Sequence, residues 1–184
     1  MRNGIVVCAL LAVAVFAIAG CGSTDQNAAT QAGGDVRRAT AWMNPTEGNS
    51  GGGSAIFIRE GDRITVQVTL EQLPPGVHAL HIHENGDCSA ADGTSAGGHW
   101  NPTGQDHGEW GTAPFHLGDL GNVTIAEDGT GSLALDTDLW TMGGGADTDV
   151  LGRAVILHAG PDDFTTQPTG GAGARLACGV IKVK

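Results

Sequence analysis

The chain has no tyrosine, few aromatic residues and few cationic side chains. Of its 184 residues 16% are charged, and nine Lys and Arg stand against 20 Asp and Glu, for a formal net charge of −11. A chain with so few cations lacks the basic surface that nucleic-acid phosphates or anionic lipids attract, so we expect no nucleic-acid partner. The scarcity of charge and the 31 glycines, more than twice the usual share of ~7%, argue against a helical bundle and favour short strands joined by tight turns.

The first 20 residues have the pattern of an export signal. Arg2 is followed by an apolar run from Ile5 to Ile18, which is the charge-then-apolar order of a signal peptide. The run ends in Ile-Ala-Gly-Cys at positions 18–21 and resembles a bacterial lipobox. We therefore expect cleavage before Cys21 and lipidation of Cys21, with palmitate among the acyl groups. A plain signal peptide with a chance cysteine and an uncleaved anchor helix are the alternatives.

The segment that follows is small and polar. Residues 22–36 offer almost nothing to bury, so they are interpreted as a flexible tether. The predicted organisation is a lipoprotein signal peptide at 1–20, a lipidated N-terminus and tether at 21–36, and one domain at 37–184. The mature protein would be an extracytoplasmic bacterial lipoprotein that touches the membrane only through its N-terminal lipid. Removal of Arg2 with the leader takes the net charge to −12.

Two cysteines remain in the predicted domain, Cys88 and Cys178, 90 positions apart. An even number of cysteines in an exported chain favours a disulfide, because extracytoplasmic compartments are oxidising. Two unpaired structural thiols are the alternative.

The domain has the patterning of strands. Apolar residues from Ile64 to Leu70 alternate with polar ones, which is the period of a half-buried strand. Similar runs occupy 38–43, 54–59, 77–83, 122–126, 131–136, 152–158 and 177–183, and hairpin signals stand at Asp128-Gly129 and, more weakly, at Glu60-Gly61-Asp62. We predict an all-β fold, an eight-stranded Greek-key barrel or sandwich without a long helix. The aperiodic stretch 85–121 is long enough to indicate a functional loop.

All seven histidines lie between positions 78 and 158. In the predicted strand 77–83, alternation places His81 and His83 on one face and His78 on the other. The pair on one face can chelate a metal, whereas His78 is interpreted as a core residue. The further candidate ligands are His99, His107, His116, Asp119 and His158. Imidazole ligands suit copper and zinc, while calcium or magnesium sites use oxygen almost exclusively.

Five separated segments resemble the copper-zinc superoxide dismutase family. They are residues 81–88, 97–102, 116–122, 152–158 and 173–181, and the likeness runs from about residue 37 to the C-terminus. The resemblance implies a barrel with long metal-binding loops and the dismutation of superoxide, a small anionic substrate, to dioxygen and hydrogen peroxide.

The resemblance also assigns the ligands, one copper ion and one zinc ion per subunit. Copper would be held by His81, His83, His99 and His158, and zinc by His99, His107, His116 and Asp119, so that the two metals share the His99 ring. Asp162 matches the carboxylate that links a copper histidine to a zinc histidine; a simple loop-turn aspartate is the alternative.

Arg175 matches the arginine that guides the anion, and with His99 it would be catalytic; pairing with a carboxylate is the alternative role. The segment 161–174 is shorter than the charged loop of the family and contains no Lys or Glu. Arg175 would therefore attract superoxide nearly alone.

Two functions from other classes remain as alternatives. One is a lipid-anchored copper-binding or storage module without turnover, and the other is a structural sandwich that binds only zinc. The complete set of copper ligands and Arg175 argue against both. The sequence does not decide between a monomer and a homodimer.

Overall fold

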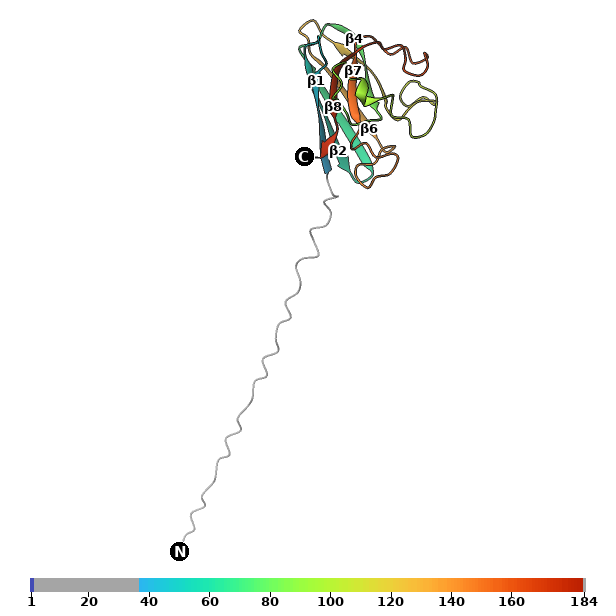
Figure 1. Cartoon of the computed structure of the whole chain (residues 1–184). Coiled ribbons are helices and arrows are strands. Elements are labelled where there is room, and N and C mark those ends of the chain that lie inside the picture. The colour runs from blue at the N-terminus through green and yellow to red at the C-terminus, as the bar shows by residue number, and fades with distance from the viewer. Residues whose placement is uncertain (2–36, 184) are drawn as a thin grey trace. The chain divides into compact units, whose positions relative to one another are not determined.

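The computed structural model describes Met1 and residues 37–183. Residues 37–183 form an antiparallel β-barrel (Figure 1). The predicted leader, Cys21 and the tether lie outside the described residues and stay predictions. The strands are β1 (Arg37–Pro45), β2 (Gly52–Glu60), β3 (Arg63–Glu71), β4 (Gly76–His83), β5 (Asp119–Ile125), β6 (Gly131–Thr137), β7 (Ala154–His158), β8 (Arg175–Val180) and β9 (Lys182–Val183). All eight predicted strands are present, and the last predicted run is divided at Ile181 into β8 and β9.

Helix is nearly absent from the described part of the chain. The 3-10 turn η1 (Thr94–Ala96) is the helical element found there. Nothing in residues 37–183 is a helix long and apolar enough to cross a membrane.

The strands are hydrogen-bonded in the order β5-β4-β7-β8-β1-β2-β3-β6, and β9 pairs with β1. The connections from β3 to β4 and from β6 to β7 cross between the two halves of this order, which gives the predicted Greek-key arrangement. The turn predicted at Glu60-Gly61-Asp62 closes a regular β2–β3 hairpin, with Glu60 opposite Arg63. The predicted all-β barrel is therefore confirmed.

The second predicted hairpin turn is also present, but its strands diverge. Asp128 accepts a hydrogen bond from the Thr130 amide at 2.9 Å, and Gly129 has a φ of 80°, a conformation that glycine adopts without strain. Beyond the turn, β5 pairs with β4 and β6 pairs with β3, and the described residues contain no β5–β6 ladder. Because β5 and β6 are not paired, the barrel is nearly, but not completely, closed.

The strands around the metal-binding face are buried on both sides. Leu80 and Ile82 of β4 point into the main core, while His81 and His83 point to the opposite face. That outer face is covered by the loop after β4 and has a small apolar cluster of its own, made of Ala96, Ala154, Ile156 and Cys178 with Cys88. The unbroken burial of β4 from His78 to His83 follows from this double cover.

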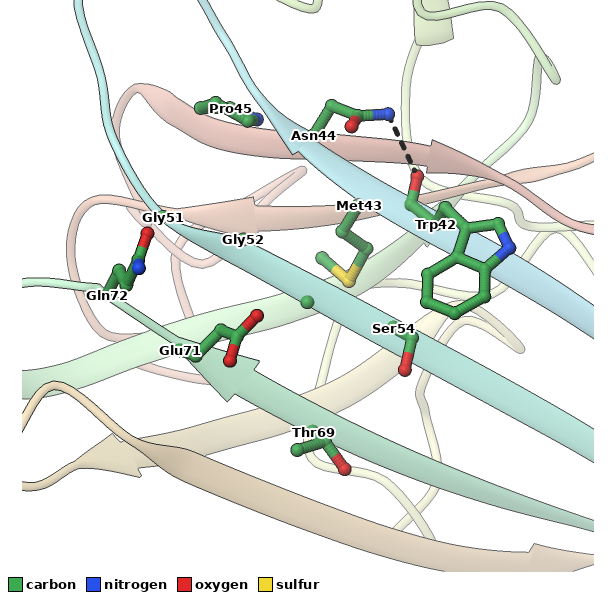
Figure 2. Close-up of a pocket in the computed structure, with 11 residues that line it drawn as sticks. Trp42, Met43, Asn44, Pro45, Gly51, Gly52, Ser54, Thr69, Glu71 and Gln72 are labelled. Atoms are coloured by element: carbon green, nitrogen blue, oxygen red, sulfur yellow. Dashed lines mark hydrogen bonds between the residues drawn. The ribbon is translucent and has the colours of Figure 1, made fainter.

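A hollow lies where β2 begins (Figure 2). Its walls come from Trp42 and the neighbouring residues of β1, from Gly51 and Gly52, and from Glu71 at the end of β3. A Cβ atom at Gly52 would overlap the Met43 carbonyl oxygen, so this close approach of β1 and β2 requires glycine. No histidine lines this hollow, and the candidate site lies elsewhere.

Candidate metal centre

The histidines converge because the long loop after β4 folds back onto that strand. His99 forms an antiparallel bridge with His83. The Trp100 amide donates to the Ile82 carbonyl at 2.8 Å, and the Ile82 amide donates to the Gly118 carbonyl at 2.8 Å. These bonds fix the two ends of the stretch 99–118 against β4.

The structure brings together every ligand that the sequence indicated, in two groups that share His99. One group contains His81, His83, His99 and His158, and the other contains His99, His107, His116 and Asp119. Within each group the possible ligand atoms lie within 4.8 Å of one another, and all seven side chains are buried. The ring centroids of His81 in the first group and His107 in the second are 5.9 Å apart, so the two groups are adjacent.

The ring nitrogens of the first group are arranged as metal ligands. His83 uses Nδ1 to contact the Gly97 carbonyl at 2.9 Å, and His158 uses Nδ1 to contact the Gly173 carbonyl at 3.2 Å. Their Nε2 atoms face each other at 3.3 Å. His81 Nδ1 and His99 Nε2 are buried without a hydrogen-bond partner. Buried polar atoms normally have partners, so these unsatisfied nitrogens fit a bound cation.

The second group is built around the Asp119 carboxylate. Its oxygens lie 2.8 Å from His99 Nδ1, 3.0 Å from His107 Nδ1 and 3.2 Å from His116 Nδ1. The last two nitrogens have no hydrogen bond despite this proximity. Ligands of a tetrahedral zinc ion with bonds of about 2.0 Å are about 3.3 Å apart. The spacing and the missing hydrogen bonds therefore fit zinc.

Asp162 connects the two groups from outside. Its carboxylate oxygens lie 2.8 Å from His81 Nε2 and 2.9 Å from His107 Nε2. The Asn122 side chain holds Asp162 in turn: Asn122 Nδ2 donates to the Asp162 carbonyl at 2.9 Å, and the Asp162 amide donates to Asn122 Oδ1 at 2.8 Å. This bridge orients both rings toward their respective groups. The role of Asn122 has no signal in the sequence, because Asn122 belongs to an ordinary strand pattern.

Burial keeps three histidines of the first group neutral. Desolvation lowers the pKa of His83 to about 2, that of His158 to about 3 and that of His99 to about 4. His107 differs: burial alone would lower its pKa, but the Asp119 and Asp162 carboxylates raise that pKa to about 9. Burial would raise the pKa of Asp119, yet the nearby rings of His107, His116 and His99 hold this pKa far below its ordinary value. Once a cation displaces the proton of His107, the second group offers imidazole nitrogens together with the anionic oxygen of Asp119.

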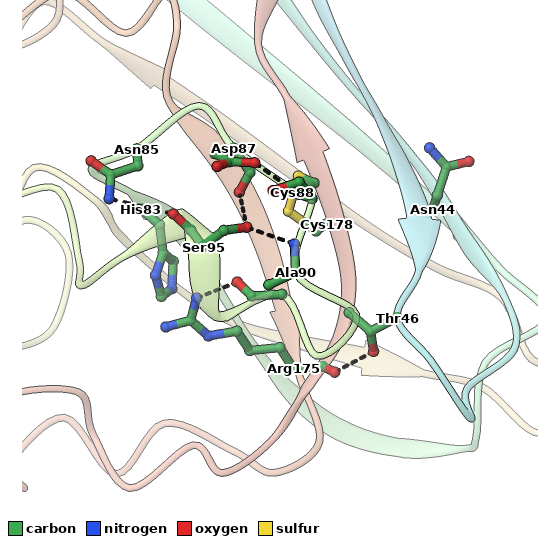
Figure 3. Close-up of a disulfide and its surroundings, with 12 residues drawn as sticks. Asn44, Thr46, His83, Asn85, Asp87, Cys88, Ala90, Ser95, Arg175 and Cys178 are labelled. Carbon is green, nitrogen blue, oxygen red and sulfur yellow. Dashed lines mark hydrogen bonds between the residues drawn. A yellow bond between two sulfur atoms is a disulfide. The ribbon is translucent and has the colours of Figure 1, made fainter.

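Arg175 lies beside the first group (Figure 3). Its guanidinium donates to the Gly93 and Gly97 carbonyls, each at 2.6 Å. The Gly97 carbonyl is also the partner of His83 Nδ1. Arg175 therefore bonds to carbonyl oxygens and forms no ion pair with a carboxylate of residues 37–183. Burial lowers the pKa of Arg175, and the charge of Asp92 opposes this shift.

The disulfide between Cys88 and Cys178 is present (Figure 3), as the sequence predicted. It joins the loop after β4 to β8, the strand that begins with Arg175. The Ser95 hydroxyl donates to the Asp87 carbonyl at 3.0 Å and accepts from the Ala90 amide at 3.1 Å, which closes the loop on itself. The loop carbonyls that hold Arg175 are thereby tied to its own strand.

His78 lies apart from both groups, as alternation predicted. The ring is buried, with Nδ1 2.9 Å from the His158 carbonyl and Nε2 3.0 Å from the Pro74 carbonyl. His78 therefore supports the backbone of a candidate ligand and is not part of either group of candidate ligands.

Comparison with known proteins agrees with this geometry. Residues 51–181 match the family model described as copper/zinc superoxide dismutase (SODC). The crystal structure of the clock protein EA4 is 37% identical, with a TM-score of 0.71, over 80% of this chain and 95% of that one. A double mutant of a SOD-like protein from Bacillus subtilis is 32% identical, with a TM-score of 0.67, over 77% of this chain and 95% of that one. The chain belongs to the copper/zinc superoxide dismutase family.

Proposed function

We propose that this protein is a superoxide dismutase that holds copper at His81, His83, His99 and His158, and zinc at His99, His107, His116 and Asp119. The observation that carries the proposal is the pair of buried ligand groups meeting at one ring. Four imidazole nitrogens suit copper, and three imidazoles with one carboxylate suit zinc.

The chemistry that bound copper supplies is one-electron transfer in both directions, while zinc contributes a fixed positive charge without redox change. In the balanced reaction two superoxide anions and two protons give one dioxygen and one hydrogen peroxide. One superoxide is oxidised and the other is reduced, so no organic cofactor or external reductant is required.

His99 is placed to hold a proton for the product. Its Nδ1 is fixed by Asp119 at 2.8 Å, whereas Nε2 is buried without a hydrogen-bond partner and faces the first group. Burial lowers the pKa of the unligated ring to about 4, so this ring is neutral near neutral pH and Nε2 is available to a cation. Because Asp119 holds Nδ1, Nε2 is the atom at which we propose that a proton is carried and passed to the peroxide.

Arg175 provides the local attraction for superoxide. Burial is the main cause of the low pKa of His83 and His158, and the charge of Arg175 lowers both further. The guanidinium therefore acts electrostatically on the same space as these two rings. In a chain with a net charge of −11, a local positive potential is required to draw in a small anion.

The direct test is superoxide decay with purified protein loaded with copper and zinc. We expect decay faster than the spontaneous rate, abolished by cyanide and by prior chelation, and absent in His83→Ala. A fully loaded protein that leaves the spontaneous rate unchanged overturns the proposal. Tight copper binding with no acceleration would instead identify a copper-holding module, and zinc uptake with no copper uptake would identify a structural zinc protein.

We also propose that the chain is exported and lipidated on Cys21, on the strength of the apolar leader and the lipobox-like sequence at 18–21. The intact mass of the mature protein from a bacterial membrane fraction tests this. The expected mass is that of residues 21–184 plus acyl groups, and Cys21→Ser should lose both the acyl mass and the membrane association. Mass at the unprocessed value, or without acyl groups, contradicts it.

A further inference from the structure

The segment 161–174 contacts one zinc-side ligand, His107, at both its ring and its backbone. The Asp162 carboxylate contacts the ring of His107 at 2.9 Å. The Gln167 side chain makes two hydrogen bonds to the backbone of the same residue. The His107 amide donates to Gln167 Oε1 at 2.9 Å, and Gln167 Nε2 donates to the His107 carbonyl at 2.9 Å. One loop residue thus satisfies both peptide groups of a buried candidate ligand.

The backbone of His107 depends on these hydrogen bonds, whereas His99 and His116 are held in other ways. His99 is bridged to β4, and the His116 amide donates to Asp119 within the same short turn. In residues 37–183, the hydrogen bonds made by the amide and carbonyl of His107 go to Gln167. The preceding residues, including Gln105 and Asp106, are exposed. Without Gln167, His107 would sit in a stretch of loop that little else holds.

We infer that Gln167 is the positioning residue for His107, and that it couples zinc binding to the conformation of the segment 161–174. The inference rests on the proposed assignment of zinc to His107. Coupling between two sites is reciprocal, so zinc should order this segment, and an intact Gln167 contact should raise zinc affinity. The segment leads directly into Arg175, so zinc would also act on the path of the substrate.

The test compares Gln167→Met with Gln105→Met. Methionine keeps the length of the side chain but removes both hydrogen bonds to His107. Gln105 is exposed two positions before the same ligand, and its side chain makes no hydrogen bond within the described residues, so it is the matched control. Zinc affinity is measured by competition with a chromogenic chelator. We expect binding about tenfold weaker in Gln167→Met, no change in Gln105→Met, and copper affinity unchanged in both.

A second measurement does not need metal. Hydrogen exchange of the His107 amide in the metal-free protein should be faster in Gln167→Met, with the Gly108 amide, which donates to Asp119, as an internal reference. Gln167→Glu keeps the acceptor for the His107 amide but loses the donor to the His107 carbonyl. This variant tests the role of Gln167 if Gln167→Met folds poorly. Intermediate protection and intermediate zinc affinity are expected for it.

The outcomes separate this inference from the proposed function. Zinc affinity and His107 exchange that are the same in Gln167→Met as in wild type overturn the role of Gln167. A wild-type protein that binds no zinc overturns the metal assignment and this inference with it. Zinc binding that depends on Gln167 in a protein without superoxide turnover supports the inference while refuting the proposed activity.

Discussion

Arg175 combines a charge with two structural hydrogen bonds, so its removal should have two effects. Arg175→Ala removes the positive charge beside His83 and frees the Gly93 and Gly97 carbonyls. We expect the rate of superoxide decay to fall severalfold and its dependence on ionic strength to flatten, because the remaining attraction is weak. Rates measured at several salt concentrations check this.

Arg175→Lys is the control for charge. Lysine keeps the positive charge but cannot make the paired contact of the guanidinium. It should preserve most of the salt dependence with a partial loss of rate. An Arg175→Ala protein whose rate and salt dependence equal those of the wild type would contradict electrostatic guidance.

Among the residues that are not candidate ligands, Asp162 is the one whose loss should affect zinc most strongly. Asp162→Asn replaces one of the two acceptors with a donor, so the carboxylate can no longer accept from both His81 and His107. Loss of such an outer partner typically weakens metal binding ten- to 100-fold, and we expect zinc affinity to fall within about that range. The neighbouring Asp163→Asn is the control, because Asp163 is exposed and bonds within its own turn to Thr165 and Thr166. Equal zinc affinity in both variants would refute the bridging role.

The ligands and Asp162 could be predicted at this scale, whereas the supports provided by Gln167 and Asn122 could not. Histidines clustered in a chain this poor in charge are chemically distinctive, and the spacing of His81 and His83 already places them on one face of a strand. Gln167 and Asn122 are common residue types whose importance depends on where two distant loops meet. Only the folded chain brings Gln167 to the backbone of His107.

At the scale of elements, the segment 161–174 depends on a glycine at one position. Gly170 and Gly171 both have a φ of +65°, which disfavours any side chain equally at the two sites. A Cβ atom at Gly170 would overlap the Asp162 carboxylate and lie 2.6 Å from His107 Nε2, whereas at Gly171 its closest neighbour is Asp163 Oδ2 at 3.4 Å.

The comparison of Gly170→Ala with Gly171→Ala therefore isolates the contact from the backbone strain. We expect both variants to lose about 1 kcal/mol of unfolding free energy, and only Gly170→Ala to lose zinc affinity as well, by about tenfold or more. Urea unfolding and chelator competition measure the two quantities. Equal zinc affinities would show that the segment can move away without affecting His107.

The elements show where patterns in the sequence stop being informative. The alternation in β3 predicts its buried and exposed faces because one face meets solvent. In β4 the outer face is covered by its own loop, so burial is continuous and only the chemistry of the histidines distinguishes the faces. The signal at Asp128-Gly129 correctly predicts a turn, but a turn fixes only a local reversal, and the pairing of β5 with β4 depends on the closure of the whole barrel.

At the scale of the whole molecule, the disulfide closes a loop of 90 residues. Cross-linking so long a segment restricts the unfolded chain by an amount equivalent to about 4 to 5 kcal/mol at most. The double variant Cys88→Ser with Cys178→Ser should therefore unfold at a lower temperature and a lower urea concentration. Its zinc affinity should change little, since the zinc-side ligands are held by Asp119 and the segment 161–174. An unchanged unfolding midpoint would show that the reduced chain is already restricted in the same way.

Acid should destabilise the metal-free protein through its buried histidines. His83, His99 and His158 titrate near pH 6.5 in the unfolded chain, but burial lowers their pKa to about 2, 4 and 3 in the fold. Below pH 6.5 the unfolded state therefore binds more protons, and stability falls as pH decreases, by up to about 1.4 kcal/mol per pH unit for each histidine.

One histidine acts in the opposite direction. His107, with its pKa raised to about 9, contributes stability that is fully present below pH 6.5 and is lost as pH rises through 9. Between pH 6.5 and 4 the contribution of His107 is constant, so His83, His99 and His158 set the slope, and the urea midpoint of the metal-free protein should decrease steadily over that range. Metal-loaded protein should resist the same acidification until protons compete for the ligands, because bound cations favour the neutral rings. A metal-free midpoint that is constant or rises between pH 6.5 and 4 would mean that these rings do not remain buried and neutral without metal.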